Sequence, residues 1–335
     1  MPRFFILLFL AAITTACGLD LRLPTDNGAL LVNDGAGYFQ FVDRDFEGVK
    51  STPWEGGQFG FVRDARRVGP RIAYARFHEG MDIKPTQRDA KGNPLDDIHP
   101  ILPGTVVHVT PSAGLSNYGR YIVVRHDLPD GAFYSLYAHL ASATVAVGDQ
   151  VTHASVLGRM GFTGSGIDQR RAHLHVELNM LLNPEFETWF ASGFRTPNHH
   201  GIYNGMNLLG LDLQALYLAH AKNPAITLSE FIRQSEAWFE LTVPATAKMD
   251  FITRYPWLRD IASVPDSAIS AWKIRCTRWG LPISVSPASQ PVSQPVVSWV
   301  KEDPIPHYYN TRGLVSNSGQ ITVSGLQFAK LLIGL

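Results

Sequence analysis

The sequence is poor in cysteine and has no excess of charge of either sign. Cys17 and Cys276 are the only cysteines among 335 residues, so a disulfide framework does not support the fold. The 29 lysines and arginines balance 29 aspartates and glutamates, and no long basic run is present, which argues against a nucleic-acid partner. A hydrophobic fraction of 45% is ordinary for a folded protein, and the length favours two domains.

The N-terminus has an apolar run that is too short to cross a membrane. Residues 1–17 combine Arg3 with the run from Phe4 to Ile13, which is typical of an export signal. The end of this segment, TTAC, resembles the lipobox of bacterial lipoproteins, although Thr14 occupies a position that is usually aliphatic. We predict a signal peptide, lipidation of Cys17 and a membrane lipoprotein that faces the periplasm, with plain secretion as the alternative.

The rest of the chain divides into three parts. Residues 18–56 form a mixed N-terminal segment. From residue 57 to 190, short β-branched and aromatic runs between Gly, Pro, Asn and Asp predict strands, and no helical period interrupts them. We therefore predict a mainly antiparallel β domain. The predicted strands are GTVVHVT, RYIVVRH, AFYSLYAHL, VLGRMGF and AHLHVEL.

Residues 195–335 are predicted to be an α+β or mainly helical accessory region of unknown role. A capping box from Thr227 to Glu230 starts one expected helix, and Cys276 is expected to be buried. The tryptophans of this region are expected to pack in the core, with a sugar- or peptide-binding surface as the alternative. Prolines in 281–300 exclude a helix and allow edge strands or an extended linker. Helices are predicted at residues 204–221, 227–239, 266–280 and 324–335.

Four of the 12 histidines stand in spaced arrangements, and one of them, His139, ends the apolar strand of LYAHL and taken singly is expected to be structural. HEGMD begins like the zinc-protease helix His-Glu-x-x-His, but Asp82 stands where the second histidine is needed, and Gly80 is a poor helix residue. In an extended segment His78 and Asp82 can still converge on one metal. In AHLHVEL, His173 and His175 lie two apart in a strand and share one face, which is either a functional site or a solvated polar face.

These segments together resemble the lysostaphin-type (LytM-like) zinc endopeptidases that cut peptidoglycan peptides. The resemblance covers about residues 57–180, in family order, through FGFVRDARR, RFHEGMDI, GTVVHV, NYGRYIVVRHD, YSLYAHL, VAVGDQVTHASVLGRMGFTGSG and AHLHVEL. It implies a LytM-like catalytic domain with one zinc ion held by His78, Asp82 and His175. It also implies that His139 and His173 are catalytic histidines.

Elementary chemistry agrees with this assignment. Two imidazoles and one carboxylate leave a fourth zinc position for water, which is the pattern of a catalytic site. A histidine is suited to take the proton because its pKa lies near neutrality, and the sequence leaves open whether His139 or His173 does so. Glu79 is not expected to be the base. The resemblance implies that Glu177 supports the ligands or the fold.

Three further residues are candidates for substrate binding. By the resemblance, Asn117 and Tyr118 lie near the substrate groove, with turn chemistry alone as the alternative. Arg171 stands where the family usually has a small or Gly-Pro stretch. It either alters the groove rim and favours a carboxylate-bearing peptide or is a solvated turn residue.

We therefore expect an exported zinc endopeptidase that hydrolyses peptide cross-links of bacterial peptidoglycan. The alternative is a catalytically silent scaffold that binds the cell wall or activates another hydrolase. A zinc-carrying structural lipoprotein is less favoured, because a structural site normally has four protein ligands. The expected partners are peptidoglycan peptides, the membrane through a lipid on Cys17, and a regulatory protein of unknown identity.

Overall fold

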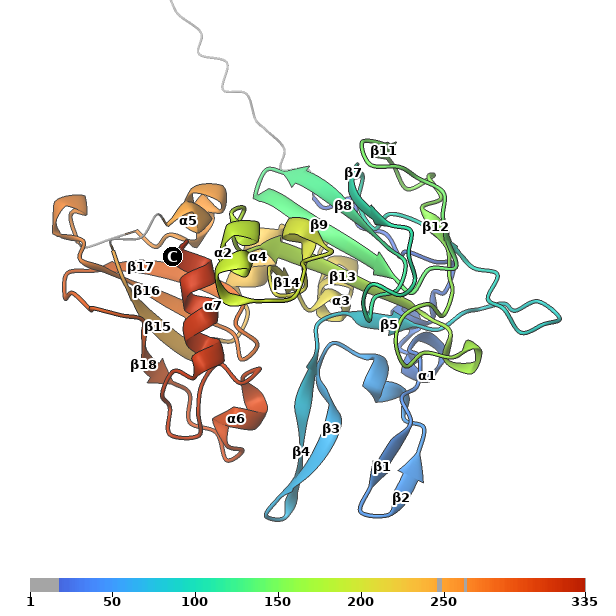
Figure 1. The fold of residues 1–335 in the computed structure, drawn as a ribbon, viewed down its shortest axis with the longest axis horizontal. Helices are drawn as coiled ribbons and strands as arrows, with labels where there is room; N and C mark the ends of the chain where they lie inside the picture. Colours follow the sequence, from blue (N-terminus) through green and yellow to red (C-terminus); the bar gives the residue numbers. More distant parts are fainter. Residues whose placement is uncertain (1–17, 246–248, 262–263, 335) are drawn as a thin grey trace, which may run out of the picture.

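The computed structural model describes residues 18–245, 249–261 and 264–334. The predicted signal peptide and the predicted lipidation site, Cys17, lie outside the described residues. In the part that is described, no helix combines the length and the apolarity that a membrane crossing requires. Figure 1 shows two sheets beside each other and two hairpins that project from the body.

A seven-stranded antiparallel sheet carries the candidate site. Its order is β11-β7-β8-β9-β13-β14. Strand β5 pairs with the first half of β13, on the same edge of β13 with which β14 pairs further along the strand. The prediction of a mainly antiparallel β domain is confirmed. The strands are β5 (Met81–Ile83), β7 (Gly104–Thr110), β8 (Tyr121–Leu128), β9 (Gly131–Ala138), β11 (Gln150–Val151), β13 (Leu174–Leu181) and β14 (Leu208–Gly210).

Strand β13 is buried along its whole length, although it carries polar side chains. Leu174, Val176 and Leu178 alternate with the polar residues and belong to the main core. His175 and Glu177 point to the opposite face, where they are 6% and 1% exposed. Buried polar groups need partners, so this face of the sheet must be organised by hydrogen bonds or a metal.

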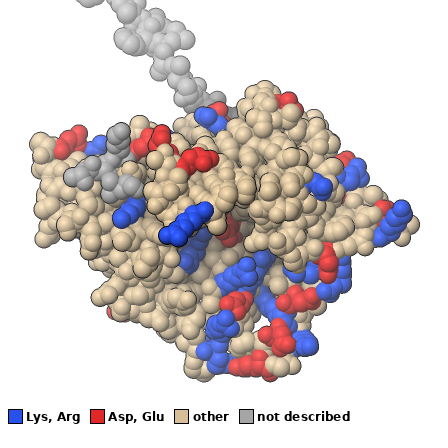
Figure 2. Space-filling model, in the orientation of Figure 1, with Lys and Arg blue, Asp and Glu red and all other residues tan. Residues whose placement is uncertain are grey.

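Two hairpins flank this sheet. They consist of β1 (Arg44–Phe46) with β2 (Val49–Ser51) and β3 (Gly60–Val68) with β4 (Arg71–His78). Figure 2 shows that charged side chains of both signs gather over these hairpins, whereas much of the remaining visible surface is uncharged. The last residue of β4 is His78, so this hairpin leads directly into the site.

Three short strands form a small separate sheet of the order β10-β12-β6. Within VLGRMGF only β12 is a strand, which is shorter than predicted. The three strands are β6 (Asp97–Ile98), β10 (Ser142–Ala143) and β12 (Gly158–Arg159).

The C-terminal region is an α+β unit with a four-stranded sheet of the order β17-β16-β15-β18. The predicted helix at 266–280 is wrong, because β16 occupies residues 271–276. Lys273 and Arg275 are exposed and alternate with buried residues, which is the two-residue period of a strand. The expected edge strands in 281–300 are confirmed. The four strands are β15 (Phe239–Pro244), β16 (Ala271–Cys276), β17 (Pro282–Ala288) and β18 (Val296–Val300).

The helices are shorter than the sequence predicted. The capping box of Thr227 and Glu230 is confirmed at the start of α4, while the final helix is capped by Thr322 and ends at Gly334 in a left-handed conformation. The helices are α1 (Gly35–Tyr38), α2 (Phe186–Gly193), α3 (Leu213–Lys222), α4 (Leu228–Arg233), α5 (Asp250–Arg254), α6 (His307–Asn310) and α7 (Val323–Ile333).

One continuous hydrophobic core joins the two sheets. It includes Leu178 of the main sheet together with Leu241 and Leu331 of the C-terminal region, and the predicted buried thiol of Cys276 is confirmed there. Polar contacts reinforce this junction. The Tyr255 hydroxyl donates to the Ala132 carbonyl at 2.7 Å, and the Asn183 amide donates to the Leu331 carbonyl at 3.1 Å. The C-terminal region is therefore packed against the β domain.

Candidate metal centre and catalytic groove

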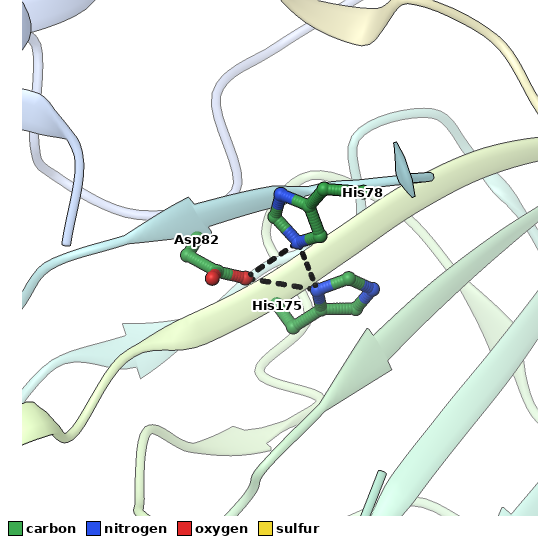
Figure 3. A group of neighbouring side chains, drawn as sticks. All are labelled: His78, Asp82 and His175. Carbon is green, nitrogen blue, oxygen red and sulfur yellow. Dashed lines mark hydrogen bonds and ion pairs between the residues drawn. The ribbon is translucent and has the colours of Figure 1, made fainter. Parts of the chain in front are cut away.

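Three strands bring the predicted metal ligands together. His78 ends β4, Asp82 is the central residue of β5, and His175 is the second residue of β13. The antiparallel register of β5 and β13 places Asp82 opposite His175, although the two are far apart in the sequence. Figure 3 shows the three side chains pointing toward one another from these strands.

The donor atoms of these residues form a compact group that fits zinc. The distances are 2.9 Å from His175 Nδ1 to Asp82 Oδ1, 3.0 Å from His78 Nε2 to Asp82 Oδ1 and 3.1 Å between the two ring nitrogens. A tetrahedral zinc ion with bonds of about 2 Å requires its ligand atoms to lie about 3.3 Å apart. Two imidazole nitrogens and one carboxylate oxygen are a donor set that zinc prefers, so the residues present fit this ion.

Hydrogen bonds select the ring nitrogen that each histidine presents. His78 Nδ1 donates to the Gln58 carbonyl at 2.7 Å, which leaves Nε2 without a proton. His175 Nε2 donates to Glu177 Oε1 at 2.8 Å, which leaves Nδ1 toward the other two ligands. A hydrogen bond from the ring nitrogen that does not face the metal fixes the tautomer and the orientation of a metal-binding histidine.

Glu177 is held in place by its own neighbours. The Tyr118 hydroxyl donates to Oε1 at 2.8 Å, and the Asn179 amide donates to Oε2 at 3.0 Å. The structure thus places Glu177 behind His175, and it gives Tyr118 a polar contact inside the site.

Arg63 is a site residue that the sequence reasoning missed. Its guanidinium is hydrogen bonded to Asp82 Oδ2, the oxygen that does not face the two histidines, and its Nε donates to the Gly56 carbonyl at 3.1 Å. The only sequence signal for it was its place in FGFVRDARR, the first segment of the resemblance. Burial opposes the charge of Asp82, but His78, His173 and Arg63 hold the pKa of that carboxyl well below its usual value.

Gly80, at the centre of HEGMD, is required by close packing against a ligand. A Cβ atom at this position would lie 2.7 Å from Cε1 of His175 and 2.7 Å from the Val176 carbonyl oxygen. Such contacts are too short for real side chains, so the ring or the backbone would have to move. Gly80, which argued against a zinc-binding helix in the sequence, therefore allows His175 of β13 to approach.

The Gly80→Ala variant is expected to bind zinc at least about tenfold more weakly than the wild type, because the added methyl group displaces His175. Competition with a chromophoric chelator measures the affinity. Gly28→Ala is the matched control, since a Cβ at position 28 meets nothing within 4 Å. Equal zinc affinity of the two variants would contradict the proposed role of the close contact.

The two predicted catalytic histidines lie beside the triad. His139 follows β9 and His173 precedes β13, and their ring centroids are 4.7 Å apart. His139 Nδ1 donates to the Thr163 carbonyl at 2.9 Å, and His173 Nδ1 donates to the Arg171 carbonyl at 2.7 Å. Each ring therefore keeps Nε2 as its basic atom, and in His173 this atom lies 3.5 Å from Asp82 Oδ1.

The electrostatics of the site keep both of these histidines neutral. Burial lowers the pKa of His173 to about 4, and burial together with the neighbouring His173 and His175 lowers that of His139 well below its usual value. His175 behaves differently. Burial opposes its charge, but hydrogen bonds to Asp82 and Glu177 raise its pKa to about 10. A metal that takes Nδ1 of His175 must therefore displace a proton.

The site opens into a groove of about 1080 Å³. The three predicted substrate residues, Asn117, Tyr118 and Arg171, all line it, together with the five histidine and aspartate residues described above. The described lining residues lie between Val42 and Gly205, so His200, Asn204 and Gly205 at the start of the predicted accessory region also line the groove. The C-terminal strands and helices from β14 onward therefore contribute none of the described lining.

The C-terminal region instead supports one wall of the groove. Trp279 stacks on Phe77 of β4 with ring centroids 6.0 Å apart and an interplanar angle of 14°. Arg312 lies over the same Phe77 ring at 5.6 Å, and Arg278 lies over Phe61 of β3 at 5.1 Å. Arg312 also lies 3.6 Å from the carboxylate of Glu79. The base of the β3–β4 hairpin is thus held from outside the groove.

Comparison with known proteins supports the resemblance. Residues 76–184 match Peptidase family M23, and this range contains all five residues of the candidate site. Among curated proteins no match was found.

Several solved structures are similar in part. The catalytic domain of lysostaphin from Staphylococcus simulans is 28% identical over 30% of this chain and 66% of its own, with a TM-score of 0.23. The catalytic domain of a prophage-encoded M23 protein from Enterococcus faecalis is 22% identical over 41% of this chain and 79% of its own, with a TM-score of 0.26. Because these scores are low, the family resemblance rests on the sequence match.

Proposed function

We propose that this chain, whose residues 76–184 match Peptidase family M23, is a zinc-dependent endopeptidase that hydrolyses peptide cross-links of bacterial peptidoglycan. One observation carries the proposal. His78, Asp82 and His175 converge within 4.8 Å, and His139 and His173 stand beside them in the same groove. Hydrolysis of a peptide bond by activated water requires metal ligands and a group that accepts a proton. The three ligands and the two neutral imidazoles supply these groups.

The protein side of the mechanism follows from the hydrogen bonds. His78, Asp82 and His175 would hold a zinc ion, which when bound supplies a Lewis acid that polarises the scissile carbonyl and acidifies water. His139 and His173 are neutral and keep Nε2 unprotonated, so either can accept the proton of the attacking water. Once protonated, the same ring can donate a hydrogen bond to the oxyanion and then return the proton to the leaving amine.

The positioning of these groups is provided by neighbours that do not react. The carbonyls of Thr163 and Arg171 hold the two catalytic rings, and Glu177 holds His175. Arg63 neutralises the second oxygen of Asp82, so this carboxylate presents its first oxygen to the ligand group. Preorganisation of this kind reduces the cost of arranging charge during the reaction.

We also propose that the protein is exported and acts in the cell envelope, anchored by a lipid on Cys17. The support is the apolar run at residues 4–13 and the TTAC sequence that follows it. Peptidoglycan lies outside the cytoplasm, so export is what the proposed substrate requires. A regulatory protein partner remains part of this proposal.

The proposal is tested with purified protein and purified peptidoglycan. We expect one zinc per chain by elemental analysis and the release of newly formed amino groups and soluble fragments from the sacculus. Loss of this release after zinc is removed with a chelator, and its return when zinc is added, would support the assignment. A protein that binds no zinc and releases no fragments would overturn it.

The scaffold alternative makes a different prediction. A silent scaffold would keep its cell-wall binding or its activation of another hydrolase after a ligand is lost, whereas an endopeptidase would not keep its turnover. The presence of both ligand histidines, the aspartate and both catalytic histidines favours the enzyme. Zinc-loaded protein that binds peptidoglycan without cutting it would instead favour the scaffold.

A further inference from the structure

We propose that the groove recognises a free carboxylate on the substrate peptide, close to the bond that is cut, through Arg171 and Arg76. This inference rests on the proposed endopeptidase function and names the kind of peptide that the same groove prefers. Three observations support it. Both arginines have side-chain donors without a close partner, the segment that carries Arg171 is held by several hydrogen bonds, and the other charged side chains of the groove are already paired.

Arg171 lies next to the reacting groups. Its carbonyl accepts the hydrogen bond from His173 Nδ1 at 2.7 Å, and its side chain lines the groove. The guanidinium makes a single long contact, 3.5 Å from Nη1 to the Gly166 carbonyl. Its Nε is buried without a hydrogen-bond partner among the described residues. A buried donor of this kind is costly unless a ligand satisfies it.

The segment that carries Arg171 is fixed, unlike a solvated turn. It is a short 3-10 helix, Gln169–Arg171, whose first turn is capped by Asp168. The Gln169 amide donates to Asn93 Oδ1 at 2.7 Å, Arg88 donates to the Gln169 carbonyl at 2.7 Å, and Arg170 pairs with Asp43 at 2.6 Å. A guanidinium on a fixed backbone loses less conformational freedom when it binds a ligand.

Arg76 contributes a second cation. It lies on β4, two residues before His78, and it lines the same groove. Its backbone pairs with β3, and within the described ranges its side chain makes no hydrogen bond and no ion pair with the protein. Arg76 and Arg171 thus come from two different segments, each of which also leads to a residue of the reacting site.

Each of the remaining charged side chains described below is engaged by another residue, either in the groove or beside it. Arg63 is bound to Asp82, and Glu177 is bound to His175 at 2.8 Å. Asp64 pairs with Arg66 at 2.9 Å, and Glu79 faces Arg312 at 3.6 Å. Among the described lining residues, the charged groups left for a ligand are therefore both positive.

A carboxylate is the ligand group that matches this arrangement. The planar guanidinium binds carboxylates through two parallel hydrogen bonds, and such charge-assisted bonds are stronger than neutral ones. A peptide with a free carboxyl group near the cleaved bond would satisfy the buried Nε of Arg171. An uncharged peptide, such as a glycine bridge or an amidated stem, would leave it unsatisfied.

The test uses two cross-linked muropeptides that differ only in one carboxyl group near the cross-link, which is free in the first and converted to a carboxamide in the second. The wild type is expected to show a kcat/KM at least about tenfold higher for the free acid, mainly through a lower KM. Arg171→Ala is expected to lose most of this preference with its zinc content unchanged, and Arg76→Ala to lose part of it. Arg171→Lys, which keeps the charge without the planar group, should retain an intermediate preference.

Arg71→Ala is the matched control, because Arg71 is exposed, lies on the same strand as Arg76 and does not line the groove. It should keep the wild-type preference. Equal cleavage of both muropeptides by the wild type would overturn the inference and leave the proposed endopeptidase intact. An Arg171→Ala variant that slows both substrates equally would indicate a structural role and would also overturn it. If neither muropeptide is cleaved, the proposed function fails and the inference fails with it.

Discussion

The His78→Ala variant is expected to contain no bound zinc and to release no fragments from peptidoglycan. Only Asp82 and His175 would remain as ligands. The raised pKa of His175 would keep its ring protonated between the carboxylates of Asp82 and Glu177, so zinc would have to displace a proton to bind. Because the reaction depends on a Lewis acid and on acidified water, we expect turnover to fall by at least about four orders of magnitude, to the assay limit. Elemental analysis and the fragment-release assay measure the two effects.

His199→Ala is the control for this variant, since His199 is exposed and does not line the groove. Thermal unfolding of both proteins with zinc removed shows whether the fold is intact. Asp82→Asn is a second, isosteric test, because an amide keeps the shape of the carboxylate and loses its charge. Full zinc content and full turnover in His78→Ala would show that the group in Figure 3 is not the metal centre.

The second large effect concerns His139 and His173, the histidines that we propose transfer the proton. His173→Ala is expected to keep its zinc and to lower kcat by about 10²- to 10⁴-fold, since it removes a positioned acid–base group but no metal ligand. The same loss is expected when His139 is replaced. His139 has a φ of 65°, a left-handed conformation that asparagine tolerates better than alanine, so His139→Asn is the better variant.

The double variant separates shared from independent roles. If the two histidines act as one unit, losing both should slow the reaction little more than losing one. Zinc content measured in parallel distinguishes catalytic loss from collapse of the site. If His173→Ala and His139→Asn both retained wild-type kcat, the acid–base role of these residues would be excluded. Loss of zinc in either variant would instead mark that residue as part of the metal centre.

The packing of the C-terminal region has a consequence for how the groove is maintained. Trp279, Arg278 and Arg312 contact aromatic residues of the β3–β4 hairpin from outside the groove. That hairpin carries Arg63 and Arg76 and ends at His78. The region whose role the sequence left unknown thus supports a wall from which a proposed metal ligand and two groove arginines project.

Much of the fold could be predicted because local patterns decide it. Alternation of apolar residues marks strands such as GTVVHVT, and β7 occupies those seven residues. Prolines excluded a helix in 281–300 and left edge strands or an extended linker, and a capping box located the start of α4. The same local logic failed at 266–280. There the alternation of Lys273 and Arg275 with buried residues defines a strand, and pairing with β15 and β17 stabilises it.

The candidate residues were also visible in the sequence, because metal and acid–base chemistry restrict the residue types and strand periodicity places His173 and His175 two apart. What the sequence could not determine is the contact between distant segments. The register of β5 against β13 sets His175 opposite Asp82, and the absence of a side chain at Gly80 lets the His175 ring approach. Arg63 reaches Asp82 only through the hairpin that the C-terminal region supports. The residue types therefore came from the sequence, whereas the convergence of the donor atoms came from the tertiary structure, since sheet register and packing bring together residues that lie nearly a hundred positions apart.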